Sequence, residues 1–317
     1  MMPSRYTEDE LIARVFAPIA GPAALGLKDD AALIEPSPEA TVATVDMLVA
    51  GVHFFADDPP GAIARKALRV NLSDLAAKGA APIGFLLSLA LPADWTNDWL
   101  KAFAAGLAED AATFAAPLIG GDTTATPGPL TISITALGRT SRFAPRTGAR
   151  AGDAIYVSGT IGDAALALAL RRDAKLAARL SPLARAHLLD RYLLPRPRLD
   201  LVSLLRHHAS AAMDVSDGLA GDLAKLCAAS GVGAVVEAPT VPLSDAAREA
   251  IALAPSLFET ALTGGDDYEI LFTAGPGFAP PDAVTRIGEI LAGPAAPQFR
   301  SAAKKPLIFK KLSFSHF

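Results

Sequence analysis

Aspartates recur in this sequence beside apolar runs and glycines. Because aspartate is unfavourable in strands and helix interiors, an aspartate in such a place usually has a specific role. The segment 62–84, AIARKALRVNLSDLAAKGAAPIG, shows the periodicity of a helix. A rotation of about 100° per residue places Asp74 on one stripe with Ile63 and Val70, facing the core. An ionised carboxylate buried there is costly unless a proton, a basic partner or a metal neutralises it. Because the basic residues of the segment lie on another face, we favour a metal.

The same setting recurs for other acids along the chain. The motifs KDDAAL, TVDMLV, GGDTT, DVSDG and TGGDD contain Asp30, Asp46, Asp122, Asp214, Asp217 and Asp266. Any one of these acids is better explained as an N-cap or a turn former, but all of them together are not. Oxygen ligands with almost no His or Cys among them suit Mg²⁺ and suit zinc poorly. We therefore expect the aspartates to converge on divalent cations that hold a polyphosphate and assist phosphoryl transfer.

Familiar phosphate-binding signatures are missing from the sequence, which has neither a G-x-x-x-x-G-K-[ST] loop nor the HRD and DFG pair of protein kinases. Arg146, in the basic loop RFAPRTGAR, is a candidate phosphate clamp because a guanidinium makes bidentate contacts. A solvated linker arginine explains it equally well. His53 lies shortly after Asp46 and could contact a substrate or act as an acid, although a lone loop histidine more often does neither. Packing inside a helix explains Cys227.

Composition excludes several classes of protein. The chain has 317 residues, 51% of them hydrophobic, and a net charge of −4, which argues against a nucleic-acid surface. No apolar run approaches the roughly 18 residues of a membrane span, and the acidic N-terminus is unlike a signal peptide. A single cysteine excludes intrachain disulfides and cysteine zinc sites. We expect a cytoplasmic protein without membrane or nucleic-acid partners.

The elements that must position these residues suggest a mixed α/β fold in two domains, 1–140 and 141–317, divided at the loop SRFAPRTGARAGD. In the first half we expect a helix over 7–19 with a capping box of Thr7 and Glu10, and paired strands at AALIEP and TVATVDMLV. A helix over 62–84, a strand over 84–91, a helix over 96–114, a Gly-Gly-Asp turn at 120–122 and a strand over 130–137 follow.

The sequence of the second half predicts a similar mixture of strands and helices. We expect strands at AIYVSG, 211–215, VGAVVEA and 268–273. Helices are expected at GDAALALALRR, 182–189, in the segment LLPRPRLDLVSLLRHH, and at 216–229 with Ser216 as its N-cap. Ser244 should cap a further helix. Two halves with acidic loops suggest an active-site cleft.

With these motifs assembled, the chain resembles the thiamine-monophosphate kinase family, within the aminoimidazole ribonucleotide synthetase-like superfamily. The resemblance covers essentially the whole length and rests on KDDAALI, TVDMLVAGVHF, NLSDLAAKGA, GGDTT, DVSDGLAGDL, TGGDDYEILF and SFSHF in this order. It implies ATP-dependent phosphorylation of thiamine monophosphate to thiamine diphosphate by direct in-line, Mg²⁺-assisted transfer, with no covalent nucleophile. It also implies a homodimer whose N-terminal domains join strands into a shared barrel.

The resemblance further implies individual roles. Mg²⁺ ligands would be Asp30, Thr44, Asp46, Asp74, Asp122, Asp214 and Asp217. ATP would be contacted by Gly121, Asp122, Arg146 and Ser216. Thiamine monophosphate would be contacted by His53, Asp266 and Phe314, with Phe314 stacking on the ligand. The chain departs from the usual family pattern at Lys28 and Asp266, where Gly and Glu are common, and the stacking aromatic is either Phe314 or Phe317.

Two other functions remain open. One is a purine-pathway synthetase of the same superfamily, which uses ATP to activate an amide oxygen. The other is a non-catalytic protein that divalent ions stabilise through its aspartate loops. It would bind metal and gain thermal stability without ATP turnover.

Overall fold

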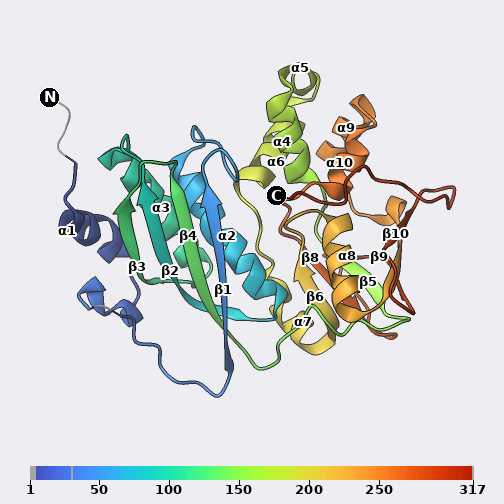
Figure 1. The fold of residues 1–317 in the computed structure, drawn as a ribbon, viewed down its shortest axis with the longest axis horizontal. Helices are drawn as coiled ribbons and strands as arrows, with labels where there is room; N and C mark the ends of the chain where they lie inside the picture. Colours follow the sequence, from blue (N-terminus) through green and yellow to red (C-terminus); the bar gives the residue numbers. More distant parts are fainter. Residues whose placement is uncertain (1–4, 30, 316–317) are drawn as a thin grey trace. The chain divides into compact units, whose positions relative to one another are not determined.

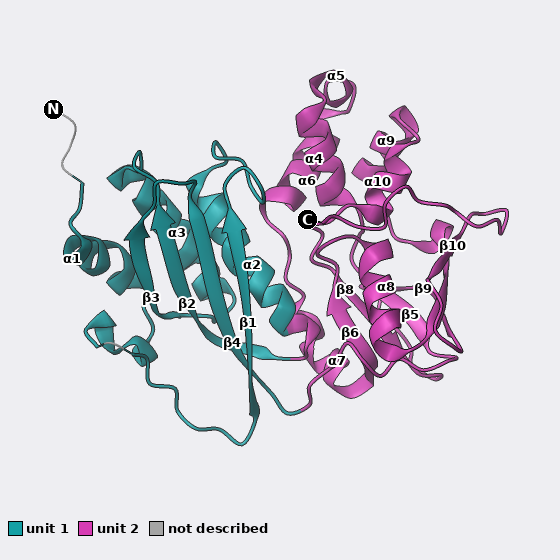
Figure 2. Ribbon diagram, viewed as in Figure 1, with its two compact units in different colours: residues 1–75, 80–141 teal, residues 76–79, 142–317 magenta. Residues whose placement is uncertain are grey.

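The computed structural model describes residues 5–29 and 31–315 (Figure 1). The chain divides into two compact units, residues 1–75 with 80–141 and residues 76–79 with 142–317 (Figure 2). Within the described residues, the first unit holds a four-stranded sheet and the second a six-stranded sheet, each with helices. The predicted mixed α/β architecture is thus confirmed. The domain limits 1–140 and 141–317 stay a prediction.

The sheet of the first unit has the strand order β1-β4-β2-β3. Its strands are β1 (Ala40–Val49), β4 (Thr131–Thr140), β2 (Ala81–Leu91) and β3 (Leu118–Ala125). β4 pairs antiparallel with both β1 and β2, whereas β2 and β3 run parallel. The helices α2 (Pro60–Ala77) and α3 (Asn97–Thr113) cover one face (Figure 1).

Alternation along the strands separates the two faces of this sheet. Ile132, Ile134 and Ala136 of β4 are buried under the helices, as period-2 patterning predicts. On β1, Val45 and Met47 point the other way, and each is 59% exposed. One face is therefore a core and the other carries large apolar side chains that the chain itself does not cover.

The predicted helices α2 and α3 are present, although α2 ends at Ala77 and not at residue 84. Their pairing explains the basic face of α2. Thr96 is the N-cap of α3 and accepts a hydrogen bond from the N–H of Trp99. Arg69 of α2 pairs with the buried Asp110 of α3, with 2.5 Å between Nε and Oδ2, and Arg65 pairs with the same carboxylate. The two arginines therefore hold the helices together.

The N-terminal segment departs from the prediction. The capping box of Thr7 and Glu10 is present, but α1 (Glu8–Leu11) ends after one turn and gives way to a π-helical turn (Ile12–Phe16) and a 3₁₀ turn (Ala17–Ile19). Pro18 lacks the N–H that a continuing helix needs. A further 3₁₀ segment covers Pro22–Leu27.

The strand predicted at AALIEP is also wrong, because residues 31–36 form no strand. Pro36 ends this segment and Pro38 lies two residues further on, and neither can donate to a sheet ladder. β1 pairs instead with β4, about ninety residues later, and Thr44 lies opposite Ala136. The local sequence pattern of β1 could not show that its partner strand is β4.

The sheet of the second unit has the order β10-β7-β9-β5-β8-β6. Its strands are β5 (Ala154–Ser158), β6 (Ala209–Asp214), β7 (Gly233–Glu237), β8 (Ile270–Ala274), β9 (Val284–Leu291) and β10 (Gln298–Arg300). The pairs are antiparallel except for the parallel pair of β10 with β7. β9 and β10 were not predicted.

Helices cover both faces of this second sheet. They are α4 (Asp163–Arg172), α5 (Ala174–Ala177), α6 (Pro182–Leu193), α7 (Val202–His208), α8 (Leu219–Ser230), α9 (Asp245–Leu253) and α10 (Leu257–Thr263), with 3₁₀ turns at Leu199–Leu201 and Ala238–Thr240. Ile155 and Val157 of β5 pack in one core with α8, and Tyr156 packs in a second core with Leu205 of α7. Every residue of β5 is buried, as expected for a strand inside the sheet.

The start of α8 corrects another prediction. Ser216 does not cap the helix, because α8 begins at Leu219 and Gly218 occupies the N-cap with φ 120°. Ser216 lies instead in the loop between β6 and α8. Ser244 caps α9 as predicted and accepts a hydrogen bond from the N–H of Ala247 at 2.9 Å.

None of the helices within residues 5–29 and 31–315 combines the length and the apolar character needed to cross a membrane.

Candidate functional site

Three of the predicted metal ligands lie together on the helix side of the first sheet. Thr44 Oγ1 donates to Asp74 Oδ2 at 2.5 Å, and the N–H of Asp46 donates to Asn71 Oδ1 at 2.9 Å. Thr44 and Asp46 share a face because they are two residues apart on β1. Asn71 and Asp74 share a face because they are three residues apart on α2. We call Thr44, Asp46 and Asp74 the β1–α2 set.

The chemistry of the β1–α2 set fits a hard cation. Its side chains supply one hydroxyl and two carboxylates, which are oxygen donors of the kind that Mg²⁺ prefers. All three residues are half-buried. Asp74 points toward the sheet as the helical stripe predicts, while Arg69 of the same helix is committed to Asp110. The set can therefore carry negative charge close to the core.

Asp122 lies elsewhere in the first unit. β3 is three strand spacings from β1, about 14 Å at the usual spacing. The register joins Asp46 through Ile134 and Leu87 to Gly121 in one row. Asp122 falls in the next row, which points to the opposite face. The structure therefore does not bring Asp122 to Asp46 within this unit.

The Gly-Gly-Asp turn predicted at 120–122 is wrong, because these residues lie within β3. A Cβ atom at Gly121 would overlap the carbonyl oxygen of Leu87 on β2. Glycine is needed there because two backbones approach closely, and not because the chain turns.

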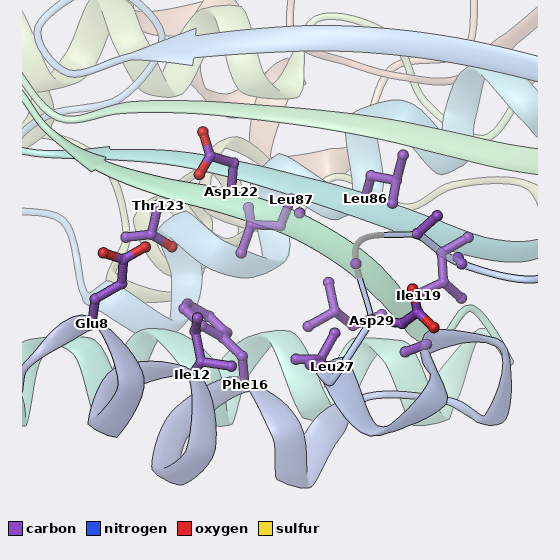
Figure 3. Close-up of a pocket in the computed structure, with 16 residues that line it drawn as sticks. Glu8, Ile12, Phe16, Leu27, Asp29, Leu86, Leu87, Ile119, Asp122 and Thr123 are labelled. Carbon is purple, nitrogen blue, oxygen red and sulfur yellow. The ribbon is translucent and has the colours of Figure 1, made fainter.

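Gly121 and Asp122 line a cavity of about 340 Å³ beside the N-terminal segment. Apolar side chains such as Ile12 and Phe16 form part of its wall, and Asp29 also lines it. Figure 3 shows Asp122 pointing away from the N-terminal helical turns that carry these two side chains. Asp30 follows Asp29 directly, but it lies outside the described residues.

In the second unit, five predicted ligand contacts come together around one loop. The carbonyl oxygen of Ser216 accepts from the N–H of Asp266 at 2.8 Å. The carbonyl oxygen of Asp217 accepts from the N–H of Phe314 at 3.0 Å. Asp214 ends β6 just before this loop and is buried. We call Asp214, Ser216, Asp217, Asp266 and Phe314 the α8-loop set.

Asp217 has a cationic partner within the same unit. Lys225 Nζ lies 2.5 Å from Asp217 Oδ2 and 2.8 Å from Asp222 Oδ1. Burial opposes the charge of Lys225, yet the hydrogen bonds to Asp217 and Asp222 raise its pKa overall. An ammonium group therefore lies where the resemblance places a metal ion.

Asp222, in the first turn of α8, is a residue beside this loop that sequence reasoning missed. Its buried carboxylate accepts from the N–H groups of Asp217 and Gly218 at 2.9 and 3.1 Å, and so holds the loop in place. Burial raises the pKa of Asp222. The signal was its spacing of three residues from Lys225 on one helix, which puts both side chains on the same face.

Two predicted contacts lie apart from these sets. Arg146 is exposed, and its carbonyl oxygen accepts from Ser230 Oγ at the C-terminal end of α8, whereas Ser216 precedes the N-terminal end. Twelve residues of helix separate these ends by about 18 Å. His53 lies in the loop after β1, where its Nδ1 accepts from the N–H of Val49 at 3.0 Å. These hydrogen bonds hold the Arg146 backbone and the His53 ring, each within its own unit.

The predicted convergence of the aspartates on one metal nest stays a prediction. Among residues 5–29 and 31–315, His, Cys, Asp and Glu form no group of three placed to hold a metal ion. The described ligands form the β1–α2 set in one unit and the α8-loop set in the other. Cys227 is buried in α8, and burial raises the pKa of its thiol to about 11, so packing explains it as predicted.

Known protein families match both halves of the chain. The family described as AIR synthase related protein, N-terminal domain, matches residues 28–140, and its C-terminal domain counterpart matches residues 150–296. The thiamine-monophosphate kinase of Caulobacter vibrioides is 42% identical over 285 residues, covering 86% of this chain and 78% of that protein. The thiamine-monophosphate kinase of Salmonella typhimurium is 42% identical over 84% of this chain and 82% of that protein. The chain belongs to the thiamine-monophosphate kinase family.

Solved structures named as thiamine-monophosphate kinases share this fold. The one from Stenotrophomonas maltophilia K279a is 41% identical over 88% of this chain and 90% of its own, with a TM-score of 0.78. A structure described as AaThiL complexed with AMPPCP and TMP covers 100% of both chains at 31% identity and a TM-score of 0.80. Hydrogenase maturation protein HypE in complex with ATP reaches a TM-score of 0.78 at 18% identity, which shows the fold alone.

Membership of the thiamine-monophosphate kinase family confirms the resemblance that the motifs carry. The individual residue roles stay predictions.

Proposed function

We propose that this chain transfers a phosphoryl group from ATP to thiamine monophosphate, giving thiamine diphosphate and ADP. The observation that carries the proposal is the match over 100% of both chains to the structure described as AaThiL complexed with AMPPCP and TMP. AMPPCP stands in for ATP, since a methylene group replaces its β–γ bridging oxygen. The α8-loop set supports the same reaction, because it joins proposed ATP and substrate contacts through backbone hydrogen bonds.

On the ATP side, we propose contacts from Gly121, Asp122, Arg146 and Ser216. Gly121 and Asp122 line a cavity that is large enough for part of a nucleotide. Ser216 lies in the loop before α8. The Asp222 carboxylate holds this loop in place by accepting hydrogen bonds from the N–H groups of Asp217 and Gly218. Arg146 is exposed, so its guanidinium is accessible for bidentate hydrogen bonds to a phosphate group of ATP.

Mg²⁺ is part of the proposal, with ligands from the β1–α2 set, from Asp214 and Asp217, and from Asp30 and Asp122. The all-oxygen donors of the β1–α2 set fit this ion. When bound, Mg²⁺ would neutralise charge on the phosphates and help to align them. The Lys225 ammonium contributes positive charge at Asp217.

On the substrate side, we propose His53, Asp266 and Phe314. Thiamine monophosphate has an aromatic, cationic core, which suits a carboxylate and the face of a ring. Phe314 is 48% exposed, so its ring is accessible for stacking. Phe317, the other candidate, lies outside the described residues. The transfer needs no covalent nucleophile, so the residues bind and orient the two substrates.

A homodimer also belongs to the proposal. Val45 and Met47 expose apolar side chains on the open face of the first sheet. A second copy that adds its own sheet to this face would cover them and close a shared barrel. We place the reaction in the cytoplasm, where the single buried thiol of Cys227 would stay reduced.

The test compares acceptor substrates in one assay of ADP release. Purified protein with ATP and Mg²⁺ should release ADP only when thiamine monophosphate is added, and chromatography should show thiamine diphosphate. Turnover that instead requires a purine ribonucleotide would assign the chain to the synthetase alternative. Thermal stabilisation by Mg²⁺ without any turnover would indicate a non-catalytic protein.

A further inference from the structure

The segment Gly264–Glu269 alternates between the surface and the core. Asp266, the proposed contact to thiamine monophosphate, is half-buried. Its neighbours Asp267 and Glu269 are only 1% and 0% exposed. Two buried acids next to a ligand contact require an explanation, because burying a carboxylate is unfavourable unless it is well paired.

Glu269 lies at the centre of a buried ion cluster. Its carboxylate accepts from Arg191 Nη2 at 2.6 Å and from Arg198 Nε and Nη2 at 2.5 and 2.6 Å. Ser158 Oγ donates to the same carboxylate at 2.5 Å and accepts from the N–H of Ile270. Gly159 leaves room for this cluster, since a Cβ there would overlap both Arg198 and Glu269. The cluster ties the start of β8 to β5 and α6.

Asp267 forms a second anchor. Its carboxylate accepts from the N–H of Gly162 at 2.7 Å and from the N–H of Ala164 at 3.5 Å, at the start of α4. Burial raises the pKa of Asp267 well above its usual value. Asp267 and Glu269 therefore hold the segment on the two sides of Tyr268.

The backbone of this segment is held in an unfavourable conformation. Asp266 has φ 74° and Tyr268 has φ 53°, in the left-handed region that residues other than glycine rarely adopt. Such conformations persist only where the surrounding structure imposes them. The buried contacts of Asp267 and Glu269 supply this constraint.

The same segment is paired with the loop of the α8-loop set. The N–H of Val215 donates to the carbonyl oxygen of Glu269 at 2.8 Å, and the N–H of Tyr268 donates to that of Val215 at 2.9 Å. The N–H of Asp266 donates to the carbonyl oxygen of Ser216 at 2.8 Å. A shift of Glu269 would thus be transmitted along three consecutive hydrogen bonds to Asp266.

We propose that Glu269, held by Arg191 and Arg198, is a positioning residue that, together with Asp267, fixes the left-handed backbone of Asp266 and so aims its carboxylate at thiamine monophosphate. This inference rests on the proposed function. It assigns a role in substrate affinity to side chains that the fold buries and that touch no substrate.

The experiment measures thiamine monophosphate affinity by calorimetry, together with KM for each substrate, in Glu269→Gln and Arg198→Met. We expect the Kd and KM for thiamine monophosphate to rise by about tenfold or more in both variants, because the carboxylate of Asp266 is no longer held in place. KM for ATP should rise less than the Kd for thiamine monophosphate, because among the proposed ATP contacts only Ser216 is hydrogen-bonded to this segment. Arg198→Lys keeps the positive charge but loses the two-pronged guanidinium contact with Glu269, so it should give an intermediate Kd.

Arg198→Met keeps the experiment decisive if Glu269→Gln fails to fold. The Arg198 side chain is 22% exposed, and its removal leaves Glu269 paired one to one with Arg191. The matched control is Asp110→Asn in the first unit, where a fully buried carboxylate also binds two arginines. It should lower the melting temperature while leaving the Kd for thiamine monophosphate unchanged.

The outcomes separate this inference from the proposed function. If wild-type protein neither binds nor phosphorylates thiamine monophosphate, the proposed function fails. If the wild type does both and Arg198→Met keeps the wild-type Kd, whatever its melting temperature, the positioning role is wrong. An equal rise of Kd in Asp110→Asn would also overturn it, because general destabilisation would then explain the effect.

Discussion

At the scale of single residues, the chain places carboxylates where only specific partners make them acceptable. Asp74 shows how far sequence reasoning reaches. The helical stripe predicts that it points inward, but the stripe cannot show that its hydrogen-bond partner is Thr44, which lies thirty residues earlier on another element. Asp267 and Glu269 escaped prediction because their partners come from distant segments. Asp222 has its partners within five residues, and its spacing from Lys225 was the signal that could have found it.

Asp46→Asn should abolish turnover and leave the fold intact. The substitution removes charge from the β1–α2 set but keeps the backbone hydrogen bond to Asn71, which the N–H makes. We expect kcat to fall by about a hundredfold or more, with little change in melting temperature. Asp98→Asn is the matched control, since this side chain is 97% exposed in the same unit and should keep wild-type kcat. Full activity in Asp46→Asn would remove Asp46 from the site.

Asp267→Asn should make stability less dependent on pH. Because burial raises the pKa of Asp267, the folded chain keeps a proton that the unfolded chain releases above a pH of about 4. The free energy of unfolding should therefore decline as the pH rises from there through the raised pKa. Asparagine has no such proton, so urea unfolding of the variant across this range should show a shallower decline. Parallel curves for the two proteins would contradict the assignment.

At the scale of elements, local patterns were sufficient where an element carries its own signals and insufficient where a distant strand decides. α2, α3 and β4 follow from periodicity and capping. The residues 31–36 looked like a strand because they are apolar, but they have no partner strand among the described residues. The Gly-Gly-Asp motif looked like a turn, yet its glycines allow β3 to approach β2.

Gly121→Ala tests this explanation of β3. Its Cβ would meet the carbonyl oxygen of Leu87, so β2 and β3 must separate. We expect a loss of about 1–3 kcal/mol in the free energy of unfolding, measured with urea. Gly128→Ala is the control, because its Cβ would meet only Thr126 Oγ1 at 3.4 Å, and it should change stability by less than about 0.5 kcal/mol. Equal effects would show that the contact with Leu87 is unimportant.

At the scale of the whole molecule, each unit is a complete mixed α/β body, and the candidate ligands are divided between the two. The sequence predicted that division of chemistry because its aspartate motifs occur in both halves. It could not show which face of the first sheet would remain uncovered. The exposed Val45 and Met47 are the structural reason to expect a second copy of the chain.

Met47→Lys should convert a dimer into a monomer. A charge on the open face of the first sheet would be buried unpaired in the shared barrel, which is strongly unfavourable. Analytical ultracentrifugation should show a dimer for the wild type and a monomer for the variant. Leu183→Lys on α6 is the control, because that residue is 84% exposed and belongs to the second unit, so the substitution should leave the dimer intact. A wild-type monomer at micromolar concentration would refute the barrel.

The most direct measurement is ³¹P nuclear magnetic resonance of the purified protein mixed with ATP, Mg²⁺ and thiamine monophosphate. We expect the thiamine monophosphate signal to be replaced by the two signals of thiamine diphosphate, with one ADP formed for each thiamine diphosphate. An unchanged thiamine monophosphate signal, with ATP intact or hydrolysed to free phosphate, would contradict it.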